Sequence, residues 1–329
     1  MSARCAWTAC ALLLCATLPA RAQNACAYPY QVGYTVTTLQ GRNVALWYPT
    51  RATAQTYPYS ASMAGVVALD AQPACGPVPL VVFSHGLGGC GTQSIYFTEE
   101  LARHGYVVAA PDHADAVLCS VTGRTGNPAA MIPQEPLDEP ALWSPDTYAD
   151  RLADLEAVID ALLADSIFGP LIDARRIGAS GHSLGGYTVL GMAGAWAGWK
   201  DSRIRAVLAM SPYVEPFTLQ KTLGALNIPA MYQGAQLDVG ITPTLMGPDG
   251  AYAQTPVPKY FAELVGGTHY VWTNAGCGSA TSVQACLTEP DPVMVDAYGI
   301  AFFDRYLKSQ RSPLLGGNGF GLADWEHAP

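Results

Sequence analysis

The chain has 329 residues, of which 50% are hydrophobic and 13% are charged, and its formal net charge at pH 7 is −9. An acidic chain with few charges is poorly suited to bind nucleic acid or an anionic surface, so we expect neither as a partner and expect a neutral or apolar substrate. The length suffices for one large α/β domain with a sizeable core. No internal repeat or linker divides the sequence.

The first 22 residues have the features of a targeting segment. Arg4 supplies a positive charge, residues 6–18 are apolar, and Ala20-Arg21-Ala22 is an A-x-A cleavage site. The apolar run is too short to span a bilayer. We therefore predict a signal peptide over residues 1–22, cleavage near Ala22, and a secreted or periplasmic monomer with no stable membrane anchor. Residues 23–329 are predicted to form a single domain.

Six cysteines follow the signal segment. An even number in an exported chain favours disulfides, and their spacing matches no zinc pattern, so we expect no metal and no cofactor. Cys277 and Cys286 are nine positions apart in a loop rich in Gly, Ser and Thr, and we predict that they pair. For the other four cysteines, we predict the pairs Cys26–Cys75 and Cys90–Cys119, because the members of each pair lie in the same third of the chain.

The chain begins with strand patterns. Residues 31–48 contain two β-rich runs separated by Gly41, which indicates an antiparallel pair. Residues 50–79 are rich in Pro, Ala, Ser and Tyr and are predicted to be surface loop, with an edge strand at 65–69. The short apolar run at 80–84 is typical of a buried parallel strand.

Strands and helices then alternate. Helices are predicted at 96–104, 146–163 and 291–308, and further strands at 106–111, 176–180, 204–211, 228–233 and 259–265. This alternation predicts an α/β fold with a mostly parallel central sheet and helices on both faces.

An irregular insertion at about residues 113–146 interrupts this alternation. Long loops in compact domains are often functional, although an ordinary surface loop is also possible. We predict a cap whose apolar side, with Trp143, lies over Ser183. Trp272 and Tyr213 are predicted to form the opposite wall, because pockets for neutral ligands are mainly apolar and aromatic.

The pattern Gly181-His182-Ser183-Leu184-Gly185 lies between a strand-like run and a helix-like run. Strand, tight turn and helix are the context of a nucleophile elbow, in which the central serine is exposed in strained backbone geometry. Glycines two residues to either side avoid collisions with the neighbouring strand and helix. Ser183 is therefore the predicted nucleophile.

A serine nucleophile needs an imidazole base, and the imidazole needs a carboxylate that sets its tautomer. Asp238 and His269 follow Ser183 in the order Ser, acid, His, and each comes just after a predicted strand. Because the carboxyl ends of parallel strands share one edge of a sheet, the three can meet there. His113, at the mouth of the insertion, is the competing candidate for the base.

Two backbone N–H groups are predicted to form the oxyanion hole. One belongs to Leu184, at the start of the helix after the elbow. The other is assigned to Leu87, in the glycine-rich run His85-Gly86-Leu87-Gly88-Gly89 that follows the strand at 80–84.

These motifs resemble the α/β-hydrolase superfamily over nearly the whole mature chain. The runs Val81-Val82-Phe83-Ser84-His85-Gly86-Leu87-Gly88 and Leu101-Ala102-Arg103-His104-Gly105-Tyr106-Val107-Val108 resemble the platelet-activating-factor acetylhydrolase and dienelactone-hydrolase-like group, and also bacterial cutinases and polyester hydrolases. Residues 261–269 look cutinase-like as well.

Two departures from the resembled families are informative. The acetylhydrolase group places its acid after the strand that follows the elbow, but here that strand ends in Ser211-Pro212-Tyr213. Asp238 lies one strand later, as in dienelactone hydrolases and cutinases. Ser183 stands where true dienelactone hydrolases have cysteine, so the resemblance does not imply that activity.

The predicted function is that of a secreted serine hydrolase that cleaves carboxylic esters through an acyl-enzyme intermediate. A cutinase, polyester hydrolase or lipase acting on insoluble esters is the alternative. A non-catalytic binding protein on a hydrolase scaffold is a third reading, which the presence of all three predicted catalytic residues disfavours.

Overall fold

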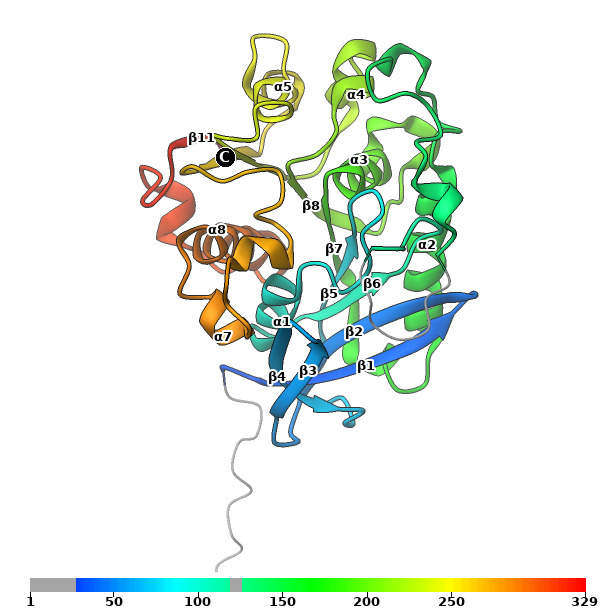
Figure 1. Ribbon diagram of the computed structural model, residues 1–329, viewed down its shortest axis with the longest axis vertical. Helices are drawn as coiled ribbons and strands as arrows, with labels where there is room; N and C mark the ends of the chain where they lie inside the picture. Colours follow the sequence, from blue (N-terminus) through cyan, green and yellow to red (C-terminus); the bar gives the residue numbers. More distant parts are fainter. Residues whose placement is uncertain (1–27, 119–125) are drawn as a thin grey trace, which may run out of the picture.

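The computed structural model of the protein describes residues 28–118 and 126–329. The predicted signal peptide, which contains three cysteines, lies outside the described residues, as do Cys26 and Cys119. The described chain forms one large sheet with helices on both faces (Figure 1).

The sheet has eleven strands in the order β11-β10-β9-β8-β7-β5-β6-β2-β1-β4-β3. The strands are β1 Gln31–Leu39, β2 Arg42–Thr50, β3 Gln55–Ser60, β4 Met63–Leu69, β5 Val78–Ser84, β6 Val107–Pro111, β7 Ile172–His182, β8 Ile204–Met210, β9 Ala230–Ala235, β10 Lys259–Leu264 and β11 Asp324–Ala328. The six strands from β10 to β6 are mutually parallel. Their carboxyl ends therefore meet at one edge, where α/β sheets commonly bind ligands.

Helices pack on each face of this sheet over a separate core. Their bounds are α1 Ile95–Arg103, α2 Ala149–Ala164, α3 Leu184–Leu190, α4 Glu215–Gln220, α5 Thr242–Met246, α6 Ala251–Gln254, α7 Val283–Cys286 and α8 Pro290–Leu307. One core lies between the sheet and α2 and α3, and the other between the sheet and α1 and α8. The predicted α/β class, with a mostly parallel sheet, is confirmed.

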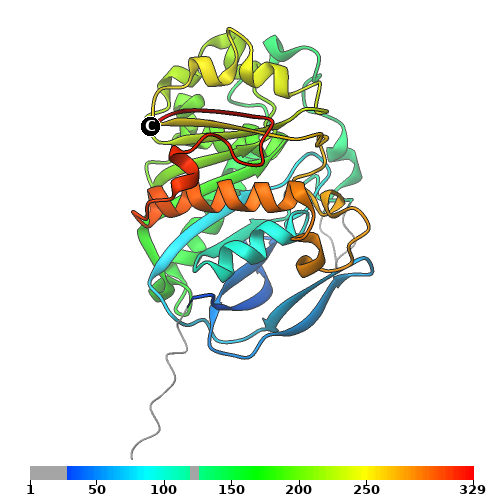
Figure 2. The same ribbon diagram turned by 90° about the vertical axis from the view of Figure 1, so that its left-hand side faces the viewer.

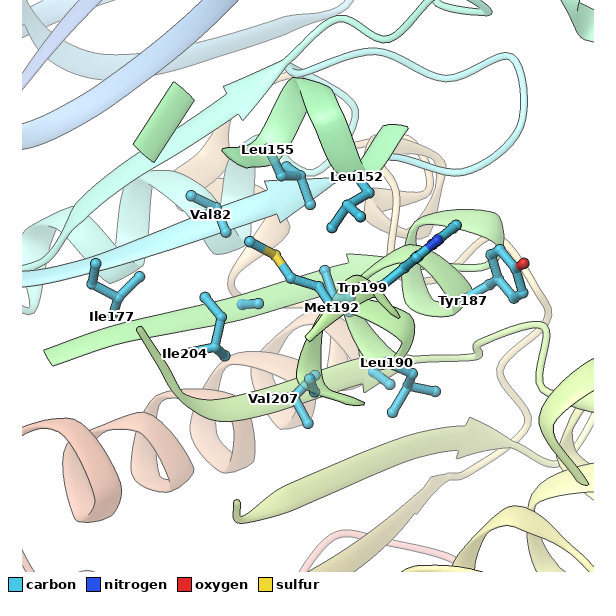
Figure 3. Close-up of a cluster of buried hydrophobic side chains, with 14 of the residues drawn as sticks. Val82, Leu152, Leu155, Ile177, Tyr187, Leu190, Met192, Trp199, Ile204 and Val207 are labelled. Atoms are coloured by element: carbon cyan, nitrogen blue, oxygen red, sulfur yellow. The ribbon is translucent and has the colours of Figure 1, made fainter. Parts of the chain in front are cut away.

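The helix α2 shows how the sequence pattern produces this packing. Its apolar residues recur at helical spacing and are buried against the sheet, as Figure 3 shows for Leu152 and Leu155 near Val82 of β5. The prediction began this helix at residue 146, three residues too early. Residues 144–147 instead form a turn, and Tyr148 adopts a left-handed conformation with φ 63° that a helix cannot continue through.

The segment predicted as surface loop contains a β-hairpin, β3 and β4. Only its second strand was predicted, because Pro58 and several serines argue against a strand. The hairpin forms because Tyr59 is buried against Tyr34 of β1, with ring centroids 4.8 Å apart, and its hydroxyl accepts a hydrogen bond from the Trp47 indole. Pro58 is tolerated because β3 is the edge strand.

The tip of this hairpin reaches the edge of the sheet where the parallel strands end. Ala64 N donates to Thr281 O at 2.9 Å, and Figure 2 shows the hairpin beside the orange segment that contains α7. The predicted disulfide Cys277–Cys286 closes that segment, with a Cα–Cα distance of 4.6 Å. Cys75 and Cys90 are also disulfide-bonded. Their pairing with Cys26 and Cys119 stays a prediction.

Asp296 of α8 is a buried carboxyl whose two oxygens have no hydrogen-bond partner among the described residues. It lines a cavity of about 490 Å³ between α1 and α8. Burial, reinforced by the nearby Glu100, raises the pKa of Asp296 well above its ordinary value. The folded protein therefore binds more protons at this site than the unfolded chain does, and its stability falls as the pH rises above the ordinary carboxyl pKa.

We expect Asp296→Asn to raise the melting temperature, with a larger gain at pH 8 than at pH 4.5. Each kcal/mol gained should raise Tm by about 2–4 °C for a domain of this size. Thermal melts at both pH values test this expectation, with the exposed Asp249→Asn as the control. An equal gain at both pH values, or a loss at pH 8, would show that ionisation of Asp296 does not destabilise the fold.

Candidate active site

Ser183 stands at the sharp turn between β7 and α3. Its φ and ψ are 56° and −118°, a strained conformation for a residue with a side chain. A Cβ added at Gly185 would lie 1.9 Å from Ser84 O, and one at Gly181 would lie 2.3 Å from Gly185 O. Glycine is therefore required at both positions, for the reason that the sequence pattern suggested.

The structure brings Ser183, His269 and Asp238 into one hydrogen-bonded chain. Ser183 Oγ lies 2.9 Å from His269 Nε2, and His269 Nδ1 lies 2.9 Å from Asp238 Oδ2. The Asp238 carboxyl is nearly buried, so the tautomer with a proton on Nδ1 is favoured, which leaves Nε2 free to accept the Ser183 proton.

Ser211 is a fourth member of this hydrogen-bonded chain, and it was not among the residues predicted from the sequence. Its buried hydroxyl donates to Asp238 Oδ2 and lies 2.9 Å from His269 Nδ1. Ser211 directly follows β8, at the place where the acetylhydrolase group has its acid. This position was the signal that the sequence offered, because a polar side chain at this strand end can reach the same imidazole.

His113, the competing base, lies elsewhere. It is fully buried, with Nε2 2.9 Å from Ser84 Oγ and Nδ1 2.9 Å from Asp154 Oδ2. Both ring nitrogens are thus occupied, and neither contacts Ser183. Burial is the main cause that lowers the pKa of His113.

Two N–H groups beside Ser183 have no hydrogen-bond partner in the described part of the chain. One is that of Leu87, in the loop after β5, and the other is that of Leu184, the first residue of α3, where an N–H has no partner within the helix. Leu87 and Leu184 line the same small cavity as Ser183. The predicted oxyanion donors are therefore available to a ligand.

Two cavities flank Ser183, and both are also lined by Leu87, Leu137 and His269. The smaller measures about 190 Å³ and the larger about 610 Å³. The insertion contributes Leu137 to both cavities and Leu118 to the larger one. The tip of the β3–β4 hairpin contributes Ser60 and Ser62 to the larger cavity, which the sequence analysis missed because it predicted a loop there.

The three residues predicted to form substrate walls differ in their positions. Tyr213 lines the smaller cavity, and its hydroxyl donates to Leu137 O at 2.8 Å. Trp272 and Trp143 line neither cavity, which corrects the prediction for both. Both side chains are buried. The Trp272 indole donates to Gln233 Oε1, and the Trp143 indole donates to Pro136 O. Both tryptophans are core residues behind the site.

A second polar chain links the loop of His269 to the loop of Leu87. His182 Nε2 donates to His269 O at 2.8 Å, and Gln93 Nε2 donates to His182 Nδ1 at 3.2 Å. Gln93 Oε1 accepts from Gly86 N at 3.1 Å. Burial, followed by the proximity of His269, lowers the pKa of His182 to about 3, so His182 is a neutral connector.

Within residues 28–118 and 126–329, no group of three or more His, Cys, Asp or Glu side chains could hold a metal ion. In the same residues, no helix combines the length and the apolar character needed to cross a membrane.

Sequence comparisons relate the chain to known hydrolases. The family model described as "Platelet-activating factor acetylhydrolase, isoform II" matches residues 69–137. Lipase 1 of Moraxella sp. is 28% identical over 48% of this chain and 42% of its own length. Cutinase 2 of Thermobifida cellulosilytica is 27% identical over 58% of this chain and 60% of its own. The chain thus spans about half the length of these curated relatives.

A solved structure shares the fold. The ferulic acid esterase of Streptomyces cinnamoneus aligns with a TM-score of 0.69 at 22% identity, covering 93% of this chain and 98% of that one. Together with the sequence matches, this likeness confirms the predicted resemblance to α/β-hydrolases of the platelet-activating-factor acetylhydrolase and cutinase type.

Proposed function

We propose that the protein is a serine hydrolase that cleaves carboxylic esters. The observation that carries the proposal is the chain of 2.9 Å contacts from Ser183 Oγ through the His269 imidazole to the Asp238 carboxyl, at a strained elbow. The relatives that support it are named lipase, cutinase and platelet-activating factor acetylhydrolase. A binding protein would have no need for a strained serine next to an oriented imidazole.

In the proposed reaction, Ser183 Oγ attacks the ester carbonyl while its proton passes to His269 Nε2. Asp238 stabilises the imidazolium, and the Leu87 and Leu184 N–H groups bind the oxyanion. The tetrahedral intermediate collapses to an acyl-enzyme, and the alcohol leaves with the proton from His269. Water, deprotonated by His269, then attacks the acyl carbon, which releases the acid and restores Ser183.

The two cavities indicate a neutral ester with unequal parts. The smaller cavity is mostly apolar and admits a short group, whereas the larger one opens between the insertion, the hairpin and the loop after His269. Insoluble esters, the substrates of a lipase or a polyester hydrolase, are the second candidate class, because Leu118 and Leu137 at the cavity are 66% and 45% exposed. We also propose export by a signal peptide at 1–22 and action as a monomer without a cofactor.

A fluorophosphonate probe tests the proposal directly. We expect it to label one site, identified as Ser183 by peptide mass spectrometry, and to abolish hydrolysis of p-nitrophenyl acetate. Absence of labelling in the folded protein would refute a serine hydrolase and favour the binding-protein reading. A panel from acetate esters to an emulsified triacylglycerol and a polyester film then separates the substrate classes.

The insertion at about 113–146 is proposed to act as a cap over the substrate. We expect Leu118→Ser combined with Leu137→Ser to lower kcat/KM for an octanoate ester by about 30-fold or more, since each of the two lost apolar contacts weakens binding by about 1–3 kcal/mol, while the acetate ester changes little. Leu142→Ser is the matched control, because Leu142 is in the same insertion, is 51% exposed and lines neither cavity. Equal losses on both esters would mean that the insertion does not shape substrate choice.

A further inference from the structure

A buried ion pair lies beneath the loop that carries Leu87. Arg151, near the start of α2, and Asp115, in the segment after β6, have 0% and 4% of their side chains exposed. Arg151 Nη2 lies 2.9 and 2.7 Å from the two Asp115 oxygens. The Arg151 guanidinium opposes the effect of burial and holds the pKa of Asp115 at about 2. Neither residue takes part in the proposed chemistry.

This pair bonds the backbone on both sides of Leu87. Arg151 Nη1 donates to His85 O at 2.7 Å and Nη2 to Gly86 O at 3.3 Å. Asp115 Oδ2 accepts from Gly88 N at 2.8 Å. Leu87 lies between these contacts, and its own N–H has no hydrogen-bond partner among the described residues.

The Gly86 carbonyl is the most informative of these groups, because it belongs to the same peptide unit as the Leu87 N–H. In a trans peptide the C=O and the N–H point in opposite directions, so fixing one aims the other. Besides Arg151, the carbonyl accepts from Gly89 N at 3.0 Å and from His85 Nδ1 at 2.7 Å. His85 carries its proton on Nδ1 because its Nε2 accepts from His113 N at 3.0 Å.

We propose that Arg151 and Asp115 are positioning residues that aim the Leu87 N–H at the oxyanion. A cationic donor on the Gly86 oxygen also polarises that peptide, which strengthens the N–H as a donor. This inference rests on the proposed esterase function. Loss of one oxyanion donor typically lowers kcat by about 10²- to 10³-fold, and misaimed donors should cause part of that loss.

A purely structural role predicts a different result. Buried ion pairs often add little net stability, and an apolar replacement of similar volume can be neutral. If the pair only filled space, changes at Arg151 would alter the melting temperature and leave kcat intact. The two roles therefore separate in kcat measured on protein that is shown to be folded.

The test uses Arg151→Lys, Arg151→Met and Asp115→Asn in the full chain, with p-nitrophenyl acetate as substrate. Lysine keeps the charge but cannot bond His85 O, Gly86 O and Asp115 together, because it lacks the planar fork of arginine. We expect kcat to fall about 10- to 100-fold in Arg151→Lys, with KM within about twofold, and to fall further in Arg151→Met.

Arg103→Lys is the matched control, since Arg103 pairs with the buried Glu99 on α1 away from this loop. The control is expected to keep its kcat. Unchanged kcat in folded Arg151→Lys and Asp115→Asn, or an equal loss in the control, would overturn the proposal. If Arg151→Met does not fold, the other two variants decide. Failure of the esterase function itself would appear separately, as a wild-type protein that neither hydrolyses the ester nor reacts with the fluorophosphonate.

Discussion

Ser183→Ala is expected to lower kcat on p-nitrophenyl acetate by about 10⁴- to 10⁶-fold, the usual result when a nucleophile is removed from such a triad. The reason is that no other described hydroxyl hydrogen-bonds to His269 Nε2, so the substitution removes the group that attacks the carbonyl. Alanine accepts the same backbone conformation no worse than serine does, and the fold should persist. Fixed-time hydrolysis assays with purified protein measure the loss of kcat, and a melting curve shows whether the fold persists.

Ser180→Ala is the control for this change. Ser180 lies three positions earlier on β7, and its buried hydroxyl has no hydrogen-bond partner among the described residues. Its removal should leave kcat within about twofold, because no described group loses a hydrogen bond when this hydroxyl is removed. Substantial activity in folded Ser183→Ala, after contamination is excluded by a second purification, would show that the nucleophile lies elsewhere.

His269→Ala is expected to have an effect of similar size, about 10⁴-fold or more in kcat. Without the imidazole, Ser183 keeps its proton and remains a weak nucleophile. Measurement of kcat on p-nitrophenyl acetate with purified protein that is shown to be folded checks this expectation.

His113→Ala distinguishes the two candidate bases. His113 bonds Ser84 and Asp154, so its loss should destabilise the fold by about 1–3 kcal/mol, the cost of leaving buried partners unsatisfied. At a temperature where this variant is folded, kcat should stay within about tenfold of the wild type. An inactive His113→Ala beside an active His269→Ala would reverse the assignment.

The ends of two neighbouring strands, β8 and β9, place polar side chains beside the same imidazole. Asp238 follows β9, whereas Ser211 follows β8, and both side chains converge on His269 Nδ1. Neighbouring parallel strands end at the same edge of the sheet, so a carboxylate from either strand reaches the same imidazole. With Asp238 after β9, the place after β8 is left to the small hydroxyl of Ser211, which donates to the Asp238 carboxyl.

The sequence by itself determined the features that depend on local pattern. The order of parallel strands and helices followed from apolar runs and periodicity, and the elbow from the glycines around Ser183. The Cys277–Cys286 bridge was predictable because its two halves are nine positions apart. In each case the physical constraint acts over a few neighbouring residues, so the amino-acid sequence alone is enough to predict the feature.

Only the tertiary structure decided which side chains meet across elements. The β3–β4 hairpin forms because Tyr59 is buried against Tyr34 of β1 and Trp47 of β2. The strand β11 pairs with β10 although 59 residues lie between Leu264, where β10 ends, and Asp324, where β11 begins. Trp272 and Trp143 turned out to be core residues, since indole hydrogen bonds to Gln233 and Pro136 hold them inside.

The contacts of Arg151 and Asp115 with the Leu87 loop depend on tertiary structure in the same way. Arg151 looks like an ordinary charged residue on an amphipathic helix, and Asp115 like a loop residue after a strand. Their role depends on the distance between a helix and a loop, which is set by how both pack on the sheet. Periodicity indicates which face of a helix or strand is buried. It does not indicate which polar group of another element that face will contact.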